Sequence, residues 1–220
     1  MATVFGAIIK PLYLRARYVS SQMNDRRLGI RTTDELVAQD LGQDIADYYR
    51  RYKALPFHGI GRIMRRLAPS ASDAFLDIGC GAGRVVSVAA SYPFRRIIGI
   101  DIEKEFCNLA ETNVRMLRQG GVRPEIICTD ASIYRVPDDI TVVFLYNPFR
   151  GDVLHASLTR ILESFDREPR RIRLVYANPR EHDQLMSMQR FRDIGQLAIS
   201  WRPGKEWNRT QIVRFYDVEG

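Results

Sequence analysis

The stretch that decides the fold is Phe75-Leu-Asp-Ile-Gly-Cys-Gly-Ala-Gly-Arg84, in which a short apolar run ends in an aspartate and three alternating glycines. The pattern predicts a buried strand that turns sharply into a helix. Glycine suits such a turn, because a backbone that bends tightly and lies against a ligand leaves no room for Cβ atoms, and the amides that open the next helix point toward the ligand. An ordinary helix-start turn is the alternative interpretation. The residues of the expected ligand-binding wall are Gly79, Cys80, Gly81 and Gly83.

The spacing of the glycines separates two kinds of cofactor site. A dinucleotide fingerprint is G-x-G-x-x-G, whereas here the third glycine comes one position early and Asp77 stands two places before the first glycine. The pattern Asp77-x-Gly79-x-Gly81-x-Gly83 resembles the first motif of the class I S-adenosylmethionine-dependent methyltransferases. In that family the loop passes the amino-acid end of the cofactor. The resemblance therefore implies S-adenosylmethionine as the cofactor and Asp77 as one of its binding residues.

Two further apolar strands are each followed by an acidic residue. Asp101 comes roughly 20 residues after the first glycine, the interval at which an acidic side chain receives a ribose hydroxyl pair. Asp130 ends a third short strand, where the resembled family often holds the adenine amino group. Either acid alone is equally compatible with a helix N-cap. We expect both to meet Asp77 in one crevice. The predicted cofactor-binding residues of these two strand ends are Asp101, Ile102, Asp130 and Ala131.

Strands and helices alternate through the middle of the chain, which predicts an α/β fold with a mostly parallel, doubly wound, Rossmann-like sheet. Continuous apolar runs such as Val142–Tyr146 are typical of strands buried on both faces. The last third favours two strands joined through Pro203-Gly204, a hairpin at the sheet edge. The predicted elements are strand 74–78, helix 84–92, strand 96–100, helix 103–117, strands 125–128 and 141–146, helix 152–165, and strands 171–176, 191–201 and 210–218.

The resemblance to class I methyltransferases covers residues 60–220 and makes the fold more specific. It implies a seven-stranded sheet in the order 3-2-1-4-5-7-6, with the last strand antiparallel. We expect two parts, residues 1–59 as an N-terminal helical arm or cap and residues 60–220 as the methyltransferase domain. The cofactor should then lie at the carboxyl ends of the strands, at the switch point of the sheet.

The N-terminal arm mixes apolar residues with basic ones and is interrupted by Pro11. It favours packing over the cofactor face or onto a partner chain, and a helix lying on an anionic membrane is the alternative. A second expected helix, 34–51, begins after Thr33 as its N-cap. The loop that follows it contains Tyr52, which we expect to lie beside the glycine wall and contact the cofactor, although an ordinary connector is equally compatible with the sequence.

The acceptor is expected near the end of the fourth strand, at Leu145-Tyr-Asn-Pro-Phe149. This segment resembles the Asn/Asp-Pro-Pro-aromatic motif of amino-group methyltransferases, with one proline missing. In those enzymes the amide or carboxylate accepts hydrogen bonds from the target nitrogen, so the resemblance implies Asn147 as a catalytic residue that also borders the cofactor. An Asx-Pro turn that ends the strand is the alternative. The whole pattern resembles a bacterial class I group of unassigned acceptor and, more distantly, the non-SET lysine methyltransferases.

Composition limits the remaining choices. Lysine and arginine number 33 against 26 aspartates and glutamates, a formal charge of +7, which suits a nucleic acid, an anionic membrane face or an acidic substrate. No run of 18 apolar residues occurs, so no transmembrane segment is expected. Three cysteines without C-x-x-C spacing predict reduced, buried thiols in a cytoplasmic protein, and no metal site is expected.

Three functions are compatible with these patterns. The first is a S-adenosylmethionine-dependent methyltransferase that acts on a small molecule or on a protein- or lipid-linked group. The second is an RNA or DNA methyltransferase, motivated by the positive charge and by the arginine-rich segment 167–173. The third is a non-catalytic cofactor-binding module that has kept the fold.

Overall fold

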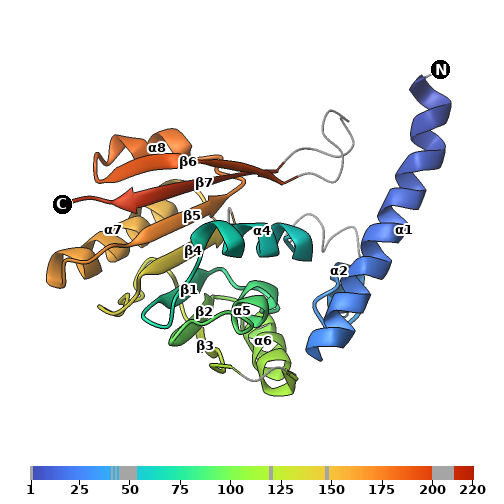
Figure 1. Cartoon of the computed structure of the whole chain (residues 1–220), viewed down its shortest axis with the longest axis horizontal. Helices are drawn as coiled ribbons and strands as arrows, with labels where there is room; N and C mark the ends of the chain where they lie inside the picture. The colour runs from blue at the N-terminus through green and yellow to red at the C-terminus, as the bar shows by residue number, and fades with distance from the viewer. Residues whose placement is uncertain are drawn as a thin grey trace.

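A computed structural model describes residues 2–40, 42, 44, 54–118, 121–146, 149–199 and 211–220 (Figure 1). These residues form one sheet with helices on both faces. The strands are β1 (Ala74–Ile78), β2 (Arg96–Asp101), β3 (Glu125–Cys128), β4 (Val142–Tyr146), β5 (Arg173–Ala177), β6 (Phe191–Ile199) and β7 (Gln211–Val218). The helices are α1 (Ala2–Leu28), α2 (Asp34–Asp40), α4 (Phe57–Leu67), α5 (Arg84–Ala89), α6 (Lys104–Met116), α7 (Gly151–Arg167) and α8 (His182–Ser187).

The described strands lie in the order β3-β2-β1-β4-β5-β7-β6, as predicted. Strands β1 to β5 pair in parallel, and β7 runs antiparallel to both β5 and β6. The strand order therefore reverses direction between β1 and β4. Such a switch point opens a crevice at the carboxyl ends of the strands, where ligands bind in sheets of this kind.

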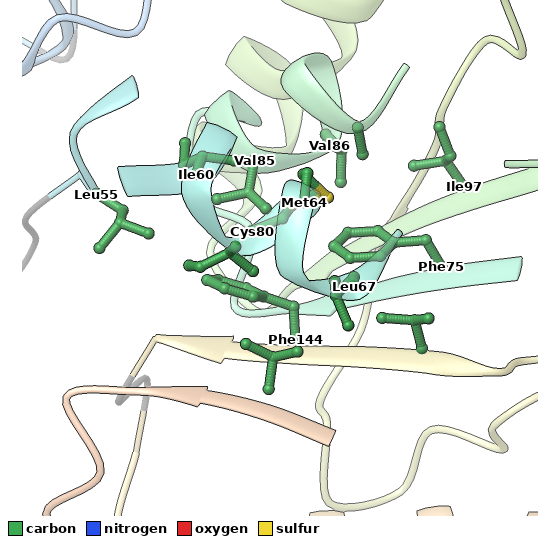
Figure 2. Close-up of a cluster of buried hydrophobic side chains, with 14 of the residues drawn as sticks. Leu55, Ile60, Met64, Leu67, Phe75, Cys80, Val85, Val86, Ile97 and Phe144 are labelled. Atoms are coloured by element: carbon green, nitrogen blue, oxygen red, sulfur yellow. The ribbon is translucent and has the colours of Figure 1, made fainter. Parts of the chain in front are cut away.

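Two hydrophobic clusters, one on each face of the sheet, hold the layers together. Helices α4, α5 and α6 pack on one face, where Phe75 and Phe144 lie in the same cluster (Figure 2). The ring centroid of Phe75 is 5.1 Å from that of Phe94 and 6.4 Å from that of Phe144. Helix α7 buries Leu154, Leu158 and other apolar residues against the opposite face, with α8 beside it. Burying a side chain of this size contributes about 1.5–3 kcal/mol, so the sheet is fixed from both sides.

Most predicted strands agree with the structure to within one or two residues, whereas the helices include three surprises. Helix α1 continues through Pro11, because one missing hydrogen bond in a long helix removes less than its remaining bonds supply. Helix α5 ends at Ala89 rather than at residue 92, and the short helix α8 was not predicted. No described helix has both the length and the apolar character that crossing a membrane requires.

Other predictions fall on the N-terminal region and on the last hairpin. The second expected helix begins at Asp34 as predicted, and beyond Asp40 most of its predicted length lies outside the described residues. The predicted boundary between residues 59 and 60 falls inside α4. The hairpin turn at Pro203-Gly204 also lies outside the described residues, although the strands on either side of it pair as expected.

A buried carboxylate fixes the chain where α1 gives way to α2. Asp25 accepts hydrogen bonds from the backbone N–H and the hydroxyl of both Thr32 and Thr33, at 2.6–2.9 Å. The side-chain amide of Asn113 in α6 accepts the Arg31 N–H at 2.7 Å and donates to the Arg31 carbonyl at 3.0 Å. The start of α1 projects away from the body, while its end is joined to the domain (Figure 1). Thr33 directly precedes α2, at the predicted N-cap position, where its carbonyl accepts the Val37 N–H at 3.0 Å and its hydroxyl donates to Asp25.

We expect the substitution Asp25→Ala to lower the free energy of unfolding by about 3 kcal/mol, because it leaves buried donors without an acceptor. Urea denaturation followed by circular dichroism measures this loss. The matched control is Asp40→Ala, which removes an exposed ion pair to Arg31 at 2.8 Å. An exposed pair contributes about 0–1 kcal/mol. Equal losses in the two variants would contradict the structural role given to Asp25.

Candidate functional site

A cavity of about 690 Å³ lies at the carboxyl ends of the parallel strands, at the switch point. It is large enough for a nucleoside-sized ligand together with a second molecule, since ligand sites range from roughly 300 to 1,000 Å³. The ends of β1, β2, β4 and the segment after β5 all contribute to its wall. The predicted site residues that line it are Asp77, Gly79, Cys80, Asp101, Ile102, Asp130 and Ala131.

The glycine loop has the backbone that the sequence predicted. Gly79, Gly81 and Gly83 all have positive φ, at 78°, 52° and 81°, a conformation that other residues adopt with strain. A Cβ on Gly83 would also lie 3.2 Å from that of Ala110 in α6. Gly81 and Gly83 thus shape the loop from behind, while Gly79 and Cys80 face the cavity.

Asp77 is the fully buried acid of the site. The residue is 2% exposed, and its Oδ2 atom has no hydrogen-bond partner among the described residues. Burial raises the pKa of this carboxyl well above its usual range, and the charge of Asp101 adds to the shift. A buried carboxylate oxygen without a donor is costly, so the site is suited to a cationic ligand group that would stabilise the charge.

Asp101 and Asp130 present carboxylates that are already oriented by backbone amides. The Asp101 carboxylate accepts hydrogen bonds from the N–H groups of Gly81 at 2.8 Å and Glu103 at 3.0 Å. Burial nevertheless raises the pKa of Asp101, with those hydrogen bonds opposing the shift. The Asp130 carboxylate accepts from the Ser132 N–H at 2.8 Å, which lowers its pKa. Both carboxylates keep lone pairs for a ligand.

Arg84, which sequence reasoning did not single out, is a buried cation in the same wall. It is 2% exposed, donates from Nε to the Thr32 hydroxyl at 2.9 Å and from Nη1 to the Leu55 carbonyl at 3.2 Å, and binds the Thr32 carbonyl through Nη2. Its guanidinium also lies 4.8 Å from the ring centroid of Phe57. Within the described part of the chain no carboxylate pairs with Arg84. Three of its five N–H donors are thereby used, and two remain for a ligand.

The opposite wall of the cavity comes from the ends of β4 and β5. Tyr146 accepts a hydrogen bond from Gln211 at 2.7 Å, and burial raises the pKa of its phenol. Arg150, Asn178 and Arg180 line the same side. The predicted acceptor residue Asn147 and the predicted cofactor contact Tyr52 both lie outside the described residues, so their roles stay predictions.

Asn178 and Arg84 were not predicted as site residues, and they differ in whether the sequence contains a signal for them. Asn178 repeats, at the end of β5, the Asn-Pro pair that follows β4, so the repeated pattern was a usable signal. Arg84 carries no such signal, because an arginine after a glycine is usually solvated. The predicted loop after Tyr52 does reach the site, since Ala54 and Leu55 line the cavity.

The cysteines correct one prediction. Cys80 and Cys107 are buried, but Cys128 is exposed, because β3 is the edge strand of the sheet. Burial raises the pKa of Cys80 well above its usual value, and the charges of Asp77 and Asp101 add to this. Burial and the neighbouring Cys128 raise the pKa of Cys107 to about 12. These two buried thiols therefore stay protonated near neutral pH.

Comparison with known structures supports the fold. An N-methyltransferase, NodS from Bradyrhizobium japonicum with bound S-adenosyl-L-homocysteine, superposes with a TM-score of 0.60 at 13% identity, covering 86% of this chain and 100% of that one. Magnesium protoporphyrin IX methyltransferase from Synechocystis with bound S-adenosylmethionine gives 0.56 at 15% identity, covering 85% and 97%. An RNA methyltransferase from Salinibacter ruber in complex with S-adenosyl-L-homocysteine gives 0.53 at 17%, covering 76% and 94%.

These similarities concern the fold, because the acceptors of the three proteins differ and the identities are low. Among curated proteins, none matches the sequence. A family model described as the methyltransferase domain matches residues 75–167, from the start of β1 to the end of α7. This segment thus resembles the methyltransferase domain, and the sheet has the strand order of the class I S-adenosylmethionine-dependent methyltransferase fold.

Proposed function

We propose that this protein is a S-adenosylmethionine-dependent methyltransferase whose acceptor enters the cavity from the side of β4 and β5. The observation that carries the proposal is the convergence of Asp77, Asp101 and Asp130 on one cavity at the switch point. Single acids at strand ends are common helix caps, but three that border one cavity beside a glycine loop form a site. The fold of the family supplies the identity of the cofactor.

The charges in the cavity fit each part of that cofactor. Asp77 would hold the ammonium group, and Arg84, which has two donors without an acceptor among the described residues, would hold the carboxylate of the amino-acid end. The carboxylate of Asp101 would accept the ribose hydroxyls. Asp130 would accept from the adenine amino group. Exposed apolar surface of Ile102, which is 66% exposed, would cover the adenine ring.

S-adenosylmethionine, when bound, would supply an electrophilic methyl group: an acceptor lone pair would bond to the methyl carbon while the carbon–sulfur bond breaks and S-adenosylhomocysteine leaves. The residues of the chain would bind the two substrates, orient them and exclude water. Good orientation alone can lower the activation barrier by about 7–11 kcal/mol. No acid–base pair is required for that contribution. Burial keeps the Tyr146 phenol protonated at neutral pH, so this side chain would position the acceptor by hydrogen bonding. Asn147 would accept hydrogen bonds from a target nitrogen.

The structure gives less support to a nucleic-acid acceptor. The arginine-rich segment that motivated it is engaged within the protein: Arg167 pairs with Asp138 at 2.6 Å, and Arg171 pairs with Asp217 at 3.3 Å. Arg170 donates to backbone carbonyls of the segments that precede β4 and follow α7. These side chains are therefore already used for folding. A salt titration of RNA binding would separate the hypotheses, since contacts to several phosphates give a steep dependence on salt.

We expect Asp101→Asn to weaken binding of S-adenosyl-L-homocysteine about 10- to 100-fold, because charge-assisted hydrogen bonds contribute about 1.5–3 kcal/mol. Isothermal titration calorimetry measures the change. Glu105→Gln is the matched control, since Glu105 is an exposed acid in the first turn of α6. Unchanged affinity in the Asp101 variant would refute the cofactor assignment. A lack of turnover with full cofactor binding would instead favour the non-catalytic module.

Asp77→Asn should have opposite effects on stability and binding. The pKa of Asp77 is raised in the folded state, so folding favours the protonated form, and stability is lost as pH rises from the unfolded pKa near 3.8 toward the folded value. The variant lacks this loss. We expect the melting temperature of the variant, relative to that of the wild type, to increase as the pH rises above about 4. Parallel melting curves across this range would contradict the raised pKa.

In the same variant, binding of S-adenosyl-L-homocysteine should weaken, because the buried charge that faces the ammonium group is gone. Binding to the wild type should release up to one proton, since a cation beside Asp77 lowers its pKa. Calorimetry in two buffers of different ionisation enthalpy measures the protons released. The Asp77→Asn variant should release fewer. Equal release by both proteins would exclude Asp77 as the ammonium partner.

A further inference from the structure

The sequences after β4 and β5 share an Asn-Pro pair that is followed closely by an arginine. Asn147-Pro-Phe-Arg150 follows β4 and Asn178-Pro-Arg180 follows β5. The two strands are parallel neighbours, with Tyr146 paired to Ala177. Both terminal arginines line the cavity. Two guanidinium groups therefore line the wall of the cavity that lies beyond β4 and β5.

These two arginines differ from most others in the protein. Arg171, Arg190 and Arg192 are held by acidic side chains at 2.5–3.3 Å. Arg180 makes no ion pair or hydrogen bond within the described ranges, and it is exposed. Arg150 approaches Glu181 only at 3.9 Å, the outer limit of an ion pair, and its side chain is 52% exposed. The wall therefore carries cationic groups whose hydrogen-bonding capacity is largely unused.

Asn178, which lines the same cavity, has an unusual backbone conformation. Its φ is 51°, although a proline follows it, and residues before proline prefer an extended backbone. The Asn178 N–H donates to the Ile212 carbonyl at 2.8 Å, which holds the segment against β7. Among the described residues its side-chain amide has no hydrogen bond, and the residue lines the cavity. Backbone strain of this kind occurs at ligand sites, where it aims a side chain.

Charge is thus divided across the cavity. Asp77, Asp101 and Asp130 lie at the ends of β1, β2 and β3, whereas Arg150 and Arg180 lie beyond β4 and β5. The acidic side suits the proposed cofactor, which brings a sulfonium and an ammonium group. The basic side would repel a second cation. A lysine side chain is therefore a poor match to this wall, and an anion is a good one.

We propose that the methyl acceptor is a small molecule with a phosphate or carboxylate group, which Arg150 and Arg180 bind while the Asn178 amide orients it. The proposal rests on the methyltransferase function proposed above. Guanidinium forks match the geometry of both anions and bind them through paired hydrogen bonds. The anion anchors the acceptor at the mouth of the cavity, and its nucleophilic atom reaches inward toward the cofactor.

The test uses the full chain and separates cofactor binding from anion binding. Calorimetry first measures binding of S-adenosyl-L-homocysteine, which reports on the proposed function alone. Inorganic pyrophosphate, and in a second arm malonate, is then titrated into the protein saturated with S-adenosyl-L-homocysteine. The variant is Arg150→Gln with Arg180→Gln. The control is Arg115→Gln with Arg123→Gln, which removes equal charge from residues that do not line the cavity.

We expect saturable binding of at least one probe by the wild type and the control, and binding about tenfold or more weaker in the Arg150/Arg180 variant. The affinity for S-adenosyl-L-homocysteine should stay the same in all three. The stronger probe identifies the anion as phosphoryl or carboxylate. The proposal is overturned if the wild type binds neither probe, or if the variant binds both as the wild type does. A single-stranded RNA that binds wild type and variant equally, with a steep salt dependence, would also overturn it.

Asn178→Gly provides a second variant that keeps the fold, because glycine adopts a φ of 51° without strain. It should weaken probe binding while the melting temperature stays at or near the wild-type value. Probe binding equal to the wild type would remove Asn178 from the acceptor site. The two arginines would then remain as the proposed anion site by themselves.

Discussion

One carboxylate, that of Asp101, joins the end of β2 to the glycine loop. Asp101 ends β2, and its side chain accepts the N–H of Gly81 from the loop that follows β1. Gly79 and Cys80 donate their N–H groups to the Ile100 carbonyl one residue earlier, both at 2.9 Å. The loop is therefore held against the neighbouring strand before any ligand arrives. The pocket wall is preorganised, and little ordering entropy remains to oppose cofactor binding.

The N-terminal segment is also hydrogen-bonded to the region of the glycine loop. Arg84 follows directly after the last glycine, yet its hydrogen bonds go to Thr32 and Leu55, far away in the sequence. Asn113 supports the same segment from α6 and also donates to the Ala82 carbonyl inside the glycine loop, at 2.8 Å. The arm and the loop consequently share side chains. A disturbance of either one should be felt by the other, which makes the N-terminal region part of the site.

The sequence predicted what depends on local pattern and missed what depends on distant contacts. Continuous apolar strands, alternating with helices, and acids at strand ends leave local signatures, and these signatures pointed to Asp77, Asp101 and Asp130, which line one cavity. The burial of Arg84 has no local signature, because it is created by a segment some 50 residues earlier that folds back over it. Helix α1 illustrates the same limit, since Pro11 predicted a break that the length of the helix overrides. Asn178 lay between these cases, with a readable repeat but a strained backbone that only the structure reveals.

Asp77 and Arg84 show how unpaired buried charge can indicate a ligand. Both side chains are 2% exposed and line the same cavity, yet no ion pair joins them, and across the described residues neither has an oppositely charged side chain in hydrogen-bonding contact. A protein selected for stability alone would pair two such groups or replace them with apolar ones, since an isolated buried charge costs several kcal/mol, of order 3–5 in known cases. A zwitterionic amino-acid end has one cation and one anion a few bonds apart. In the proposed function it would offer each buried group a partner, and its ammonium group would favour the carboxylate form of Asp77, whose pKa is raised by burial in the free protein.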